Sequence, residues 1–298
     1  MKRDKRLNGF HPVDSNSSLA GKQVVIVGGT GGIGRALSRH LARRGAGVTV
    51  VGQTFRDADV SGIQFIKADL SLMSEAERVA SLLPAETLDL LIFTAGIFAA
   101  PQRQETPEGI ERDLAVSFLN RFVMLQAMAP RLGSQRKSGD RKPRVFVMGY
   151  PGTGEIGSPE DLNAERSYKV MAAHMNTVVG NEMLVLDAAR RYPQAAFFGL
   201  NPGLIKTNIR DNLFGKNSLK SRLMEGLIGL FTPTAEAYAT RITPLLLAPE
   251  IDTHSGAMFN SKGQAILPSV GLTPEYIGRF LSACDSLLAR KGLRHNEA

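Results

Sequence analysis

The sequence predicts an α/β fold in which helices cover both faces of one doubly wound parallel sheet. Short apolar runs such as residues 22–29 alternate along the chain with amphipathic segments such as residues 33–45. The apolar runs suit strands that are buried on both faces, as parallel strands are, and the amphipathic segments have helical spacing. No break in composition divides the 298 residues, so we expect a single domain.

Six successive strands are expected, followed by a short seventh. They lie within residues 22–29, 47–53, 63–70, 88–96, 143–149, 195–203 and 256–260. Helices are predicted at 33–45, 74–83, 106–132, from 165 to about 191, at 235–248 and at 274–289. Ser74 is expected to cap the second helix, and Pro244 is expected to interrupt or end the fifth.

Composition and charge narrow the classes of partner. The formal net charge is +8, from 36 Lys and Arg against 28 Asp and Glu. The basic residues are dispersed apart from clusters within residues 1–6 and 136–144, and no nucleic-acid motif accompanies them, so we expect no nucleic-acid partner. No apolar run approaches the ~18 residues of a membrane span, so no membrane partner is expected.

The amino-terminal segment and the cysteine content bear on the compartment. Residues 1–20 are predicted to form a mobile basic arm before the domain of residues 21–298. They lack the apolar core of a secretory signal, and the single Cys284 cannot form an internal disulfide. A cytoplasmic protein is therefore expected.

A glycine-rich loop joins the first strand to the first helix. In residues 27–34 (VGGTGGIG), Gly28 suits a tight turn, Gly32 lets backbone amides approach a phosphate, and Gly34 lets the helix pack on the strand. A pyrophosphate would then lie at the positive end of the helix. The loop predicts a dinucleotide site in a Rossmann-type fold, with contacts from Gly28, Thr30, Gly31, Gly32, Ile33 and Gly34.

The spacing of Gly28, Gly32 and Gly34 resembles the short-chain dehydrogenase/reductase family, and the resemblance extends from about residue 22 to 269. It implies that Asp69 and Leu70 contact the adenine, and that the segment Thr94, Ala95 and Gly96 supports the sheet and lines the ribose. It also implies that Pro202, Gly203 and Thr207 contact the nicotinamide amide. Residues 107–122 and 255–269 resemble the retinol-dehydrogenase-like branch.

The end of the second strand bears on the choice of nucleotide. NAD enzymes of this kind carry an acid there that binds the ribose 2′-hydroxyl, whereas this chain has Gly52 and Gln53. Arg35 or Arg56 could bind a 2′-phosphate, although an arginine in place of Gln53 would be the more usual sign. NADP(H) is therefore favoured over NAD(H), and a solvated role for Arg56 stays open.

The catalytic residues that the resemblance implies are missing. The family uses a Tyr with a Lys four residues on, a Ser after strand five and an Asn in helix four. Here residues 148–150 read Met-Gly-Tyr, and Ser117 takes the Asn position. Aligning on Asn176 and Glu182 puts Lys169 at the Tyr position and Ala173 at the Lys position. Aligning on Tyr168 puts Ala172 at the Lys position.

Substitutes for this set are Tyr168, Tyr150, Lys169 and Ser117. Tyr150 would leave strand five near the substrate oxygen, and a desolvated Lys169 could act as an acid. His174 is a weaker candidate, because it is six residues beyond Tyr168 and would face the opposite side of the helix. Ordinary surface or strand-end roles compete with each of these.

Two functions follow. The first is an atypical oxidoreductase that transfers hydride between NADP(H) and a carbonyl or alcohol of a small substrate. The alternative is a nucleotide-binding relative without redox turnover, acting as a sensing or ligand-binding protein or as an isomerase or lyase. Residues 208–232 resemble a lid over the substrate pocket, and their leucines and phenylalanine favour an apolar substrate. The resemblance further implies a homodimer or homotetramer formed through the helices predicted at 106–132 and from 165 to about 191.

Overall fold

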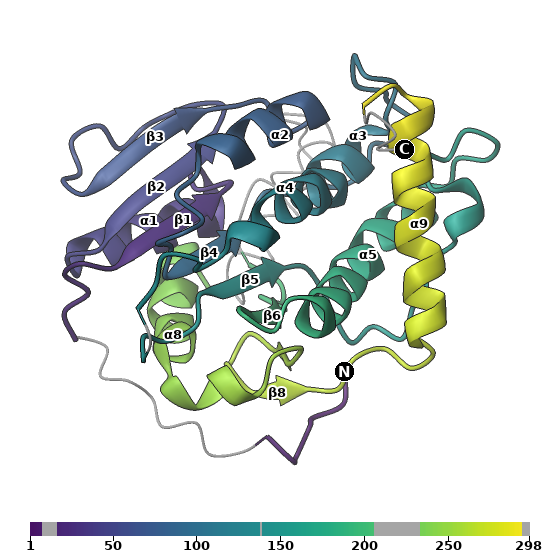
Figure 1. Cartoon of the computed structure of the whole chain (residues 1–298). Coiled ribbons are helices and arrows are strands. Elements are labelled where there is room, and N and C mark those ends of the chain that lie inside the picture. The colour runs from purple at the N-terminus through teal and green to yellow at the C-terminus, as the bar shows by residue number, and fades with distance from the viewer. Residues whose placement is uncertain (8–16, 138, 206–232, 294–298) are drawn as a thin grey trace.

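The computed structural model describes residues 1–7, 17–137, 139–205 and 233–293. The residues so described form one eight-stranded sheet with the order β3-β2-β1-β4-β5-β6-β7-β8 (Figure 1). The strands are β1 (Gln23–Val27), β2 (Gly47–Gly52), β3 (Ile63–Lys67), β4 (Leu90–Phe93), β5 (Arg144–Met148), β6 (Ala196–Leu200), β7 (Met258–Phe259) and β8 (Ala265–Ile266). The first seven run parallel, and β8 pairs antiparallel with β7.

The strand order reverses beside β1, which pairs with both β2 and β4. The connections that leave β1 and β4 therefore diverge to opposite faces of the sheet. A crevice at the carboxyl ends of these strands is where open α/β sheets bind their ligands. This reversal places the glycine loop and the segment after β4 side by side.

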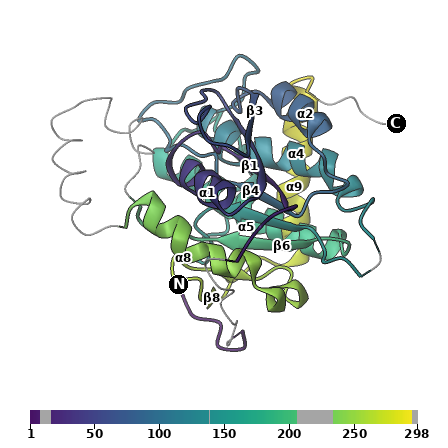
Figure 2. The same cartoon turned by 90° about the vertical axis from the view of Figure 1, so that its left-hand side faces the viewer.

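Helices cover both faces of the sheet (Figures 1 and 2). On one face, α1 (Gly32–Arg43) and α8 (Ala235–Leu247) share an apolar core with the strands. On the other face, a second core joins α2 (Met73–Leu82), α4 (Asn120–Met128), α5 (Val170–Arg191) and α9 (Pro274–Arg290). The predicted α/β fold class is confirmed.

Several local expectations are wrong. The carboxylate of Glu108, not Ser74, caps α2, and it accepts the amide of Met73 at 2.5 Å and that of Ser74 at 3.1 Å. The helix expected from residue 106 begins at Arg112 because Glu111 caps it there, with its side chain accepting the amides of residues 113 and 114. α8 continues through Pro244, since its buried side chains hold it against the core on both sides of the proline.

The helix that begins at Arg112 is irregular. It consists of α3 (Arg112–Leu114), a π-helical turn at Ala115–Leu119, α4, and a 3₁₀ turn at Ala129–Arg131. π-Helical turns inside α-helices are rare and occur frequently at functional sites. This one contains Ser117, a predicted site residue.

Part of the expected mobile arm is not free. Leu267 donates its amide to the Lys2 carbonyl at 2.9 Å, and Asp4 donates to the Ala265 carbonyl at 3.0 Å. Residues 2–4 thus extend the sheet beside β8, where Arg3 pairs antiparallel with Ile266. Edge β8 offers unpaired backbone groups that this neighbouring segment satisfies, and the mobility of the arm stays a prediction. Residues 8–16 of the arm lie outside the described part.

α9 covers the helices through which the resemblance implies an oligomer. Figure 1 shows α9 (yellow) lying along α5. Phe280 of α9 is fully buried, with its ring centroid 6.1 Å from that of Phe118 in the π-helical turn before α4. A homodimer or homotetramer formed through these helices stays a prediction. Within the described residues, no helix has the length and apolar character needed to cross a membrane.

Candidate functional site

The glycine loop follows β1 at the point where the strand order reverses. Gly28 has φ +88° and donates its amide to the Val51 carbonyl at 2.8 Å. A Cβ on Gly28 would collide with the backbone of Ala95, and one on Gly34 would collide with the Gly28 carbonyl and the Thr94 hydroxyl. Only glycine fits these two positions, because the segments after β1 and β4 meet here without room for a side chain.

The amino terminus of α1 is left open by this loop. Gly31 precedes α1 in an extended conformation and has no side chain to cap the helix, and no acidic residue lies in the first turn of α1. A Cβ built on Gly31 meets no described atom within 4 Å. Unpaired amides, the helix dipole and open space suit a phosphate group. The residues present therefore fit the pyrophosphate of a dinucleotide.

The other predicted nucleotide contacts lie around the same edge of the sheet. Thr94 bonds the Val27 carbonyl through its amide at 2.8 Å and its hydroxyl at 3.0 Å, so this segment supports β1 as expected. Asp69 accepts from the amide and hydroxyl of Ser71 at 3.0 and 2.7 Å. Burial alone would raise the pKa of Asp69, but bonds from Ser71 and Gln53 outweigh burial and lower it. Leu70 is buried, and Ile33 packs against the core.

The two arginines considered for a 2′-phosphate have different surroundings. Arg35 forms an ion pair with buried Asp57 at 2.7 Å, and Arg39 contacts the same carboxylate at 2.5 Å. The Arg35 side chain is therefore held in an ion pair that stabilises the fold. Arg56 is exposed, and its Nη1 donates to the Thr30 carbonyl of the glycine loop at 3.3 Å. Arg56 is thus the better placed of the two, and no carboxylate stands at Gln53, directly after β2.

The segment after β6 holds part of the predicted nicotinamide contacts. Gly203 has φ +70°, and its amide donates to Asn201 Oδ1 at 3.0 Å, which shapes the turn after Pro202. Asn201 is buried and in turn donates to the Pro151 carbonyl at 3.1 Å. Thr207 and the lid of residues 208–232 lie outside the described residues.

Tyr168 and Lys169 precede α5 and are not in it. Lys169 is the extended residue before Val170, where the helix begins. The expected first turn is replaced by a loop, because the Asp161 carboxylate accepts the amides of Glu165 at 2.9 Å, Arg166 at 3.1 Å and Ser167 at 3.2 Å. The expectation that His174 faces the opposite side of the helix from Tyr168 therefore does not apply, because Tyr168 is not in the helix.

Tyr168 is not an activated phenol. Its hydroxyl donates to the Ala100 carbonyl at 2.6 Å. Burial, together with the negative charges of Glu111 and Asp113, raises the pKa of Tyr168 to about 12. This is opposite to the shift that a working acid at neutral pH needs.

We expect Tyr168→Phe to change the turnover of a carbonyl substrate by less than about threefold and to lower the free energy of unfolding by about 1 kcal/mol, the value of one hydrogen bond. Steady-state rates and urea unfolding would measure the two effects. A hundredfold loss of turnover in a folded variant would show instead that the hydroxyl takes part in the chemistry.

The remaining predicted substitutes are dispersed. Tyr150 is 37% exposed after β5, and Lys169 is exposed. Ala173, at one possible position of the family's Lys, is buried on α5. The structure does not bring Tyr150, Tyr168 and Lys169 together in a hydrogen-bonded set among the described residues.

Ser117 instead belongs to a chain of contacts that ends at His174. Its hydroxyl accepts the Ile97 amide at 3.0 Å and lies 2.5 Å from Asp113 Oδ1. The second oxygen of Asp113 lies 2.7 Å from His174 Nδ1. The Phe98 ring stacks on the imidazole at a centroid distance of 4.0 Å. Asp113 was not predicted as a site residue, although it lies one helical turn before Ser117, a spacing that puts both on one face.

Arg121 was also missed by the sequence prediction. Its guanidinium is buried and donates to the carbonyls of Ala95 and Met148, and to Asn181 Oδ1 at 2.8 Å. Asn181 donates to the Ser117 carbonyl at 2.8 Å. Burial lowers the pKa of Arg121 to about 9, despite the charge of Asp113. Arg121 thus ties the carboxyl ends of β4 and β5 to α5, directly behind the candidate site.

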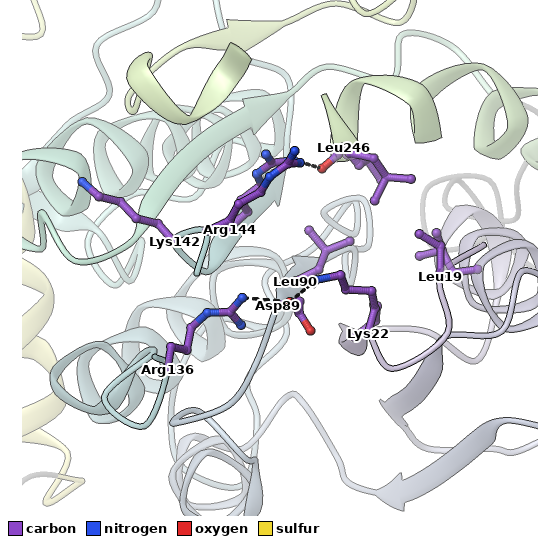
Figure 3. A pocket seen from close by; sticks show the side chains of 12 residues that line it. Leu19, Lys22, Asp89, Leu90, Arg136, Lys142, Arg144 and Leu246 are labelled. Atoms are coloured by element: carbon purple, nitrogen blue, oxygen red, sulfur yellow. Dashed lines mark hydrogen bonds and ion pairs between the residues drawn. The ribbon is translucent and has the colours of Figure 1, made fainter. Parts of the chain in front are cut away.

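A cavity of about 150 Å³ lies at the other end of the strands and is separate from this site. Figure 3 shows that Lys22 and Arg136 converge on Asp89, which they contact at 3.0 Å, and that Arg144 donates to the Leu246 carbonyl at 2.7 Å. The residues that line this cavity lie at the amino ends of β1, β4 and β5, away from the glycine loop. Lys22 and Arg136 share Asp89, Arg144 pairs with Asp252 at 2.6 Å, and the cavity lies far from the glycine loop, so the nucleotide is not assigned to it.

Comparisons with known proteins agree with the geometry. The family model described as short chain dehydrogenase matches residues 22–140. An uncharacterized oxidoreductase of Saccharomyces cerevisiae is 52% identical over 276 residues, which cover 91% of this chain and 89% of that protein. Retinol dehydrogenase 14 of Homo sapiens is 28% identical over 284 residues, 84% of this chain and 81% of its own.

A solved structure shows the same fold. The short-chain dehydrogenase/reductase from Serratia marcescens superposes with a TM-score of 0.59 at 22% identity, covering 85% of this chain and 99% of that one. The glycine cradle, the strand order and the extended match to the yeast relative all point the same way. The chain belongs to the short-chain dehydrogenase/reductase family.

Proposed function

We propose that this protein is an NADP(H)-dependent oxidoreductase that interconverts a carbonyl and an alcohol on a small apolar substrate. The observation that carries the proposal is the uncapped start of α1 above a loop that only glycine can form. Family membership implies a nicotinamide nucleotide at this place. When bound, that nucleotide supplies or accepts the hydride.

The preference for NADP(H) is supported by charge at the end of β2. A carboxylate there would bind a ribose 2′-hydroxyl and repel a 2′-phosphate, and Gln53 carries no charge. Arg56 is exposed and already contacts the glycine loop through Thr30. A guanidinium in this position can bind a phosphate with two parallel hydrogen bonds.

We expect Arg56→Ala to weaken NADPH binding about tenfold, equivalent to about 1.4 kcal/mol, and to leave NADH binding within about twofold. Gln53→Asp should also favour NADH, because it places a negative charge beside the 2′-position. Titration of nicotinamide fluorescence measures both constants. Arg141→Ala, at an exposed arginine near the cavity of Figure 3, is the matched control. Equal loss for both nucleotides in Arg56→Ala would contradict the assignment.

The apolar nature of the substrate is supported by resemblance alone. Retinol dehydrogenase 14 is named after retinol, which is an apolar alcohol. Residues 208–232 of this chain are rich in leucine. Decanal and all-trans-retinal are suitable first probes for NADPH oxidation. A hydrophilic aldehyde such as glyceraldehyde is the contrast, and preferential turnover of it would contradict the apolar assignment.

The alternative is a nucleotide-binding protein without redox turnover. It is favoured by the absence of a Tyr and Lys pair, since Ala173 stands buried on α5 and the pKa of Tyr168 is raised. The same assay separates the two functions. NADPH binding without oxidation by any aldehyde or ketone of a broad panel would support the alternative, and failure to bind either nucleotide would reject both.

A further inference from the structure

We propose that His174, oriented by Asp113, exchanges the proton with the substrate oxygen in place of the family's Tyr and Lys. The inference rests on the proposed oxidoreductase function and names the acid–base group that this function requires. It comes from a contact between α3 and α5, residues 61 apart in the chain. Three observations support it.

The first observation is the way Asp113 is held. Its side chain is completely buried, and its two oxygens are taken by different partners, Ser117 at 2.5 Å and His174 at 2.7 Å. A buried carboxylate fixed from both sides can set the tautomer and the orientation of an imidazole. Among the described residues, Nδ1 is the ring nitrogen that has a hydrogen-bonding partner, which leaves Nε2 for a proton-transfer role.

The second observation is the location of the pair. Phe98 stacks on the imidazole two residues after Gly96, and Ser117 binds the amide of Ile97. A Cβ on Gly96 would lie 3.7 Å from Ser117 Oγ. The chain of contacts from Ser117 to His174 is therefore anchored to the segment after β4, at the carboxyl edge of the sheet. His174 also follows Ala173, one position of the family's Lys, and its side chain is 17% exposed.

The third observation concerns the other candidate proton donors, Tyr168, Lys169 and Tyr150. The Tyr168 hydroxyl is bound to the Ala100 carbonyl, with the pKa of the phenol raised to about 12. Lys169 and Tyr150 are exposed outside the hydrogen-bonded chain of contacts. An imidazole is well suited to the task, because an unperturbed histidine changes charge between pH 5 and 8.

The proton and electron balance of the step is simple. In reduction, the carbonyl carbon receives a hydride from the reduced nicotinamide nucleotide while the oxygen takes the proton from Nε2 of the imidazolium. The C=O π bond breaks, C–H and O–H bonds form, and the neutral imidazole regains a proton from water. In alcohol oxidation each transfer runs in reverse, with neutral His174 as the base.

Other ionisable groups surround the pair. Glu111 precedes α3, Arg121 lies on α4, and Tyr168 precedes α5; each interacts electrostatically with Asp113. Burial raises the pKa of Glu111. A pH effect on the reaction must therefore be assigned to His174 by a direct signal from that ring and not by the rate alone.

The first experiment is His174→Asn, whose amide nitrogen can keep the bond that Nδ1 makes to Asp113 while the second ring nitrogen is lost. We expect turnover of decanal or all-trans-retinal with NADPH to fall about 10²- to 10⁴-fold, the usual contribution of general acid catalysis. The dissociation constant for NADPH, measured by fluorescence, should stay within about twofold. His40→Asn on α1 is the matched control and should retain wild-type turnover.

The second experiment observes the ring directly in the protein without nucleotide. In ¹⁵N-histidine NMR spectra, the His174 signals should show the proton on Nδ1 in the neutral form, and Asp113→Asn should alter that tautomer. The pH at which these signals titrate should coincide with the limb of kcat/KM that disappears in His174→Asn. Asp113 is a positioning residue, so Asp113→Asn should lower kcat without a matching change in NADPH binding.

The outcomes separate this inference from the function on which it rests. If the wild type reduces an aldehyde while His174→Asn keeps at least a third of that turnover, or keeps the pH limb, the role of His174 is rejected and the oxidoreductase function stands. If the wild type binds NADPH but reduces no aldehyde or ketone of the panel, both are rejected. Loss of turnover with intact NADPH binding and a shared titration supports both.

Discussion

Gly28→Val is expected to lower the free energy of unfolding by about 4 kcal/mol and to abolish NADPH binding. Two effects add at this position. Gly28 has φ +88°, which costs a non-glycine residue about 1–3 kcal/mol, and more for a β-branched one. Its Cβ would also run into the backbone of Ala95, which has no flexible end to move aside. The segments after β1 and β4 would be forced apart at the nucleotide site.

The control for Gly28→Val is Gly31→Val in the same loop. Gly31 has an ordinary extended φ of −153°, and its Cβ would face open space. Chemical denaturation should show nearly wild-type stability for Gly31→Val and a large loss for Gly28→Val. NADPH fluorescence then reports binding separately. Equal stability of the two variants would contradict the close approach of the segments after β1 and β4.

Phe280→Ala is expected to lower the free energy of unfolding by about 3–5 kcal/mol, as for other fully buried phenylalanines. The ring lies beneath α9, 6.1 Å from Phe118, in the core that α4, α5 and α9 share. Removing it leaves a cavity that three packed helices cannot close completely. Urea denaturation with a fixed slope would measure the loss.

The neighbouring Arg279→Ala provides the control for Phe280→Ala. Arg279 is 61% exposed, contacts Glu160 at 3.5 Å and lies over the Tyr276 ring, so its removal should cost less than about 1 kcal/mol. A separate variant, Phe280→Asp, tests whether α9 covers an apolar face of the protein. If it does, the aspartate should loosen α9 and expose that face, and light scattering should show self-association. A Phe280→Ala variant as stable as Arg279→Ala would show that α9 is not part of the core.

Local signals in the sequence were enough to predict the strands of the sheet and the glycine loop. Residues 24–27 are continuously apolar and end at Gly28, and both the strand and the turn follow from these neighbours alone. The missing acid at Gln53 is equally local, since it depends only on where β2 ends. These features hold because backbone geometry and side-chain periodicity act over a few residues.

The start of α5 shows where local reasoning failed. Residues 165–169 have a helical pattern in sequence, but the carboxylate of Asp161 accepts the amides of residues 165–167 and holds a loop. A side chain that bonds nearby backbone amides competes directly with helix formation. Tyr168 consequently points its hydroxyl at Ala100, a partner 68 residues away that no spacing pattern predicts.

The sequence by itself predicted the fold class, the dinucleotide-type loop and the replacement of the family's Tyr and Lys, because each prediction depends on residues close together in the chain. Only the tertiary structure decided which groups face one another. It places His174 against Asp113, Glu108 on the start of α2, and Arg121 between β4 and β5. Such contacts depend on how distant elements pack, and the energy of a buried hydrogen bond depends on that packing and not on the residue types alone.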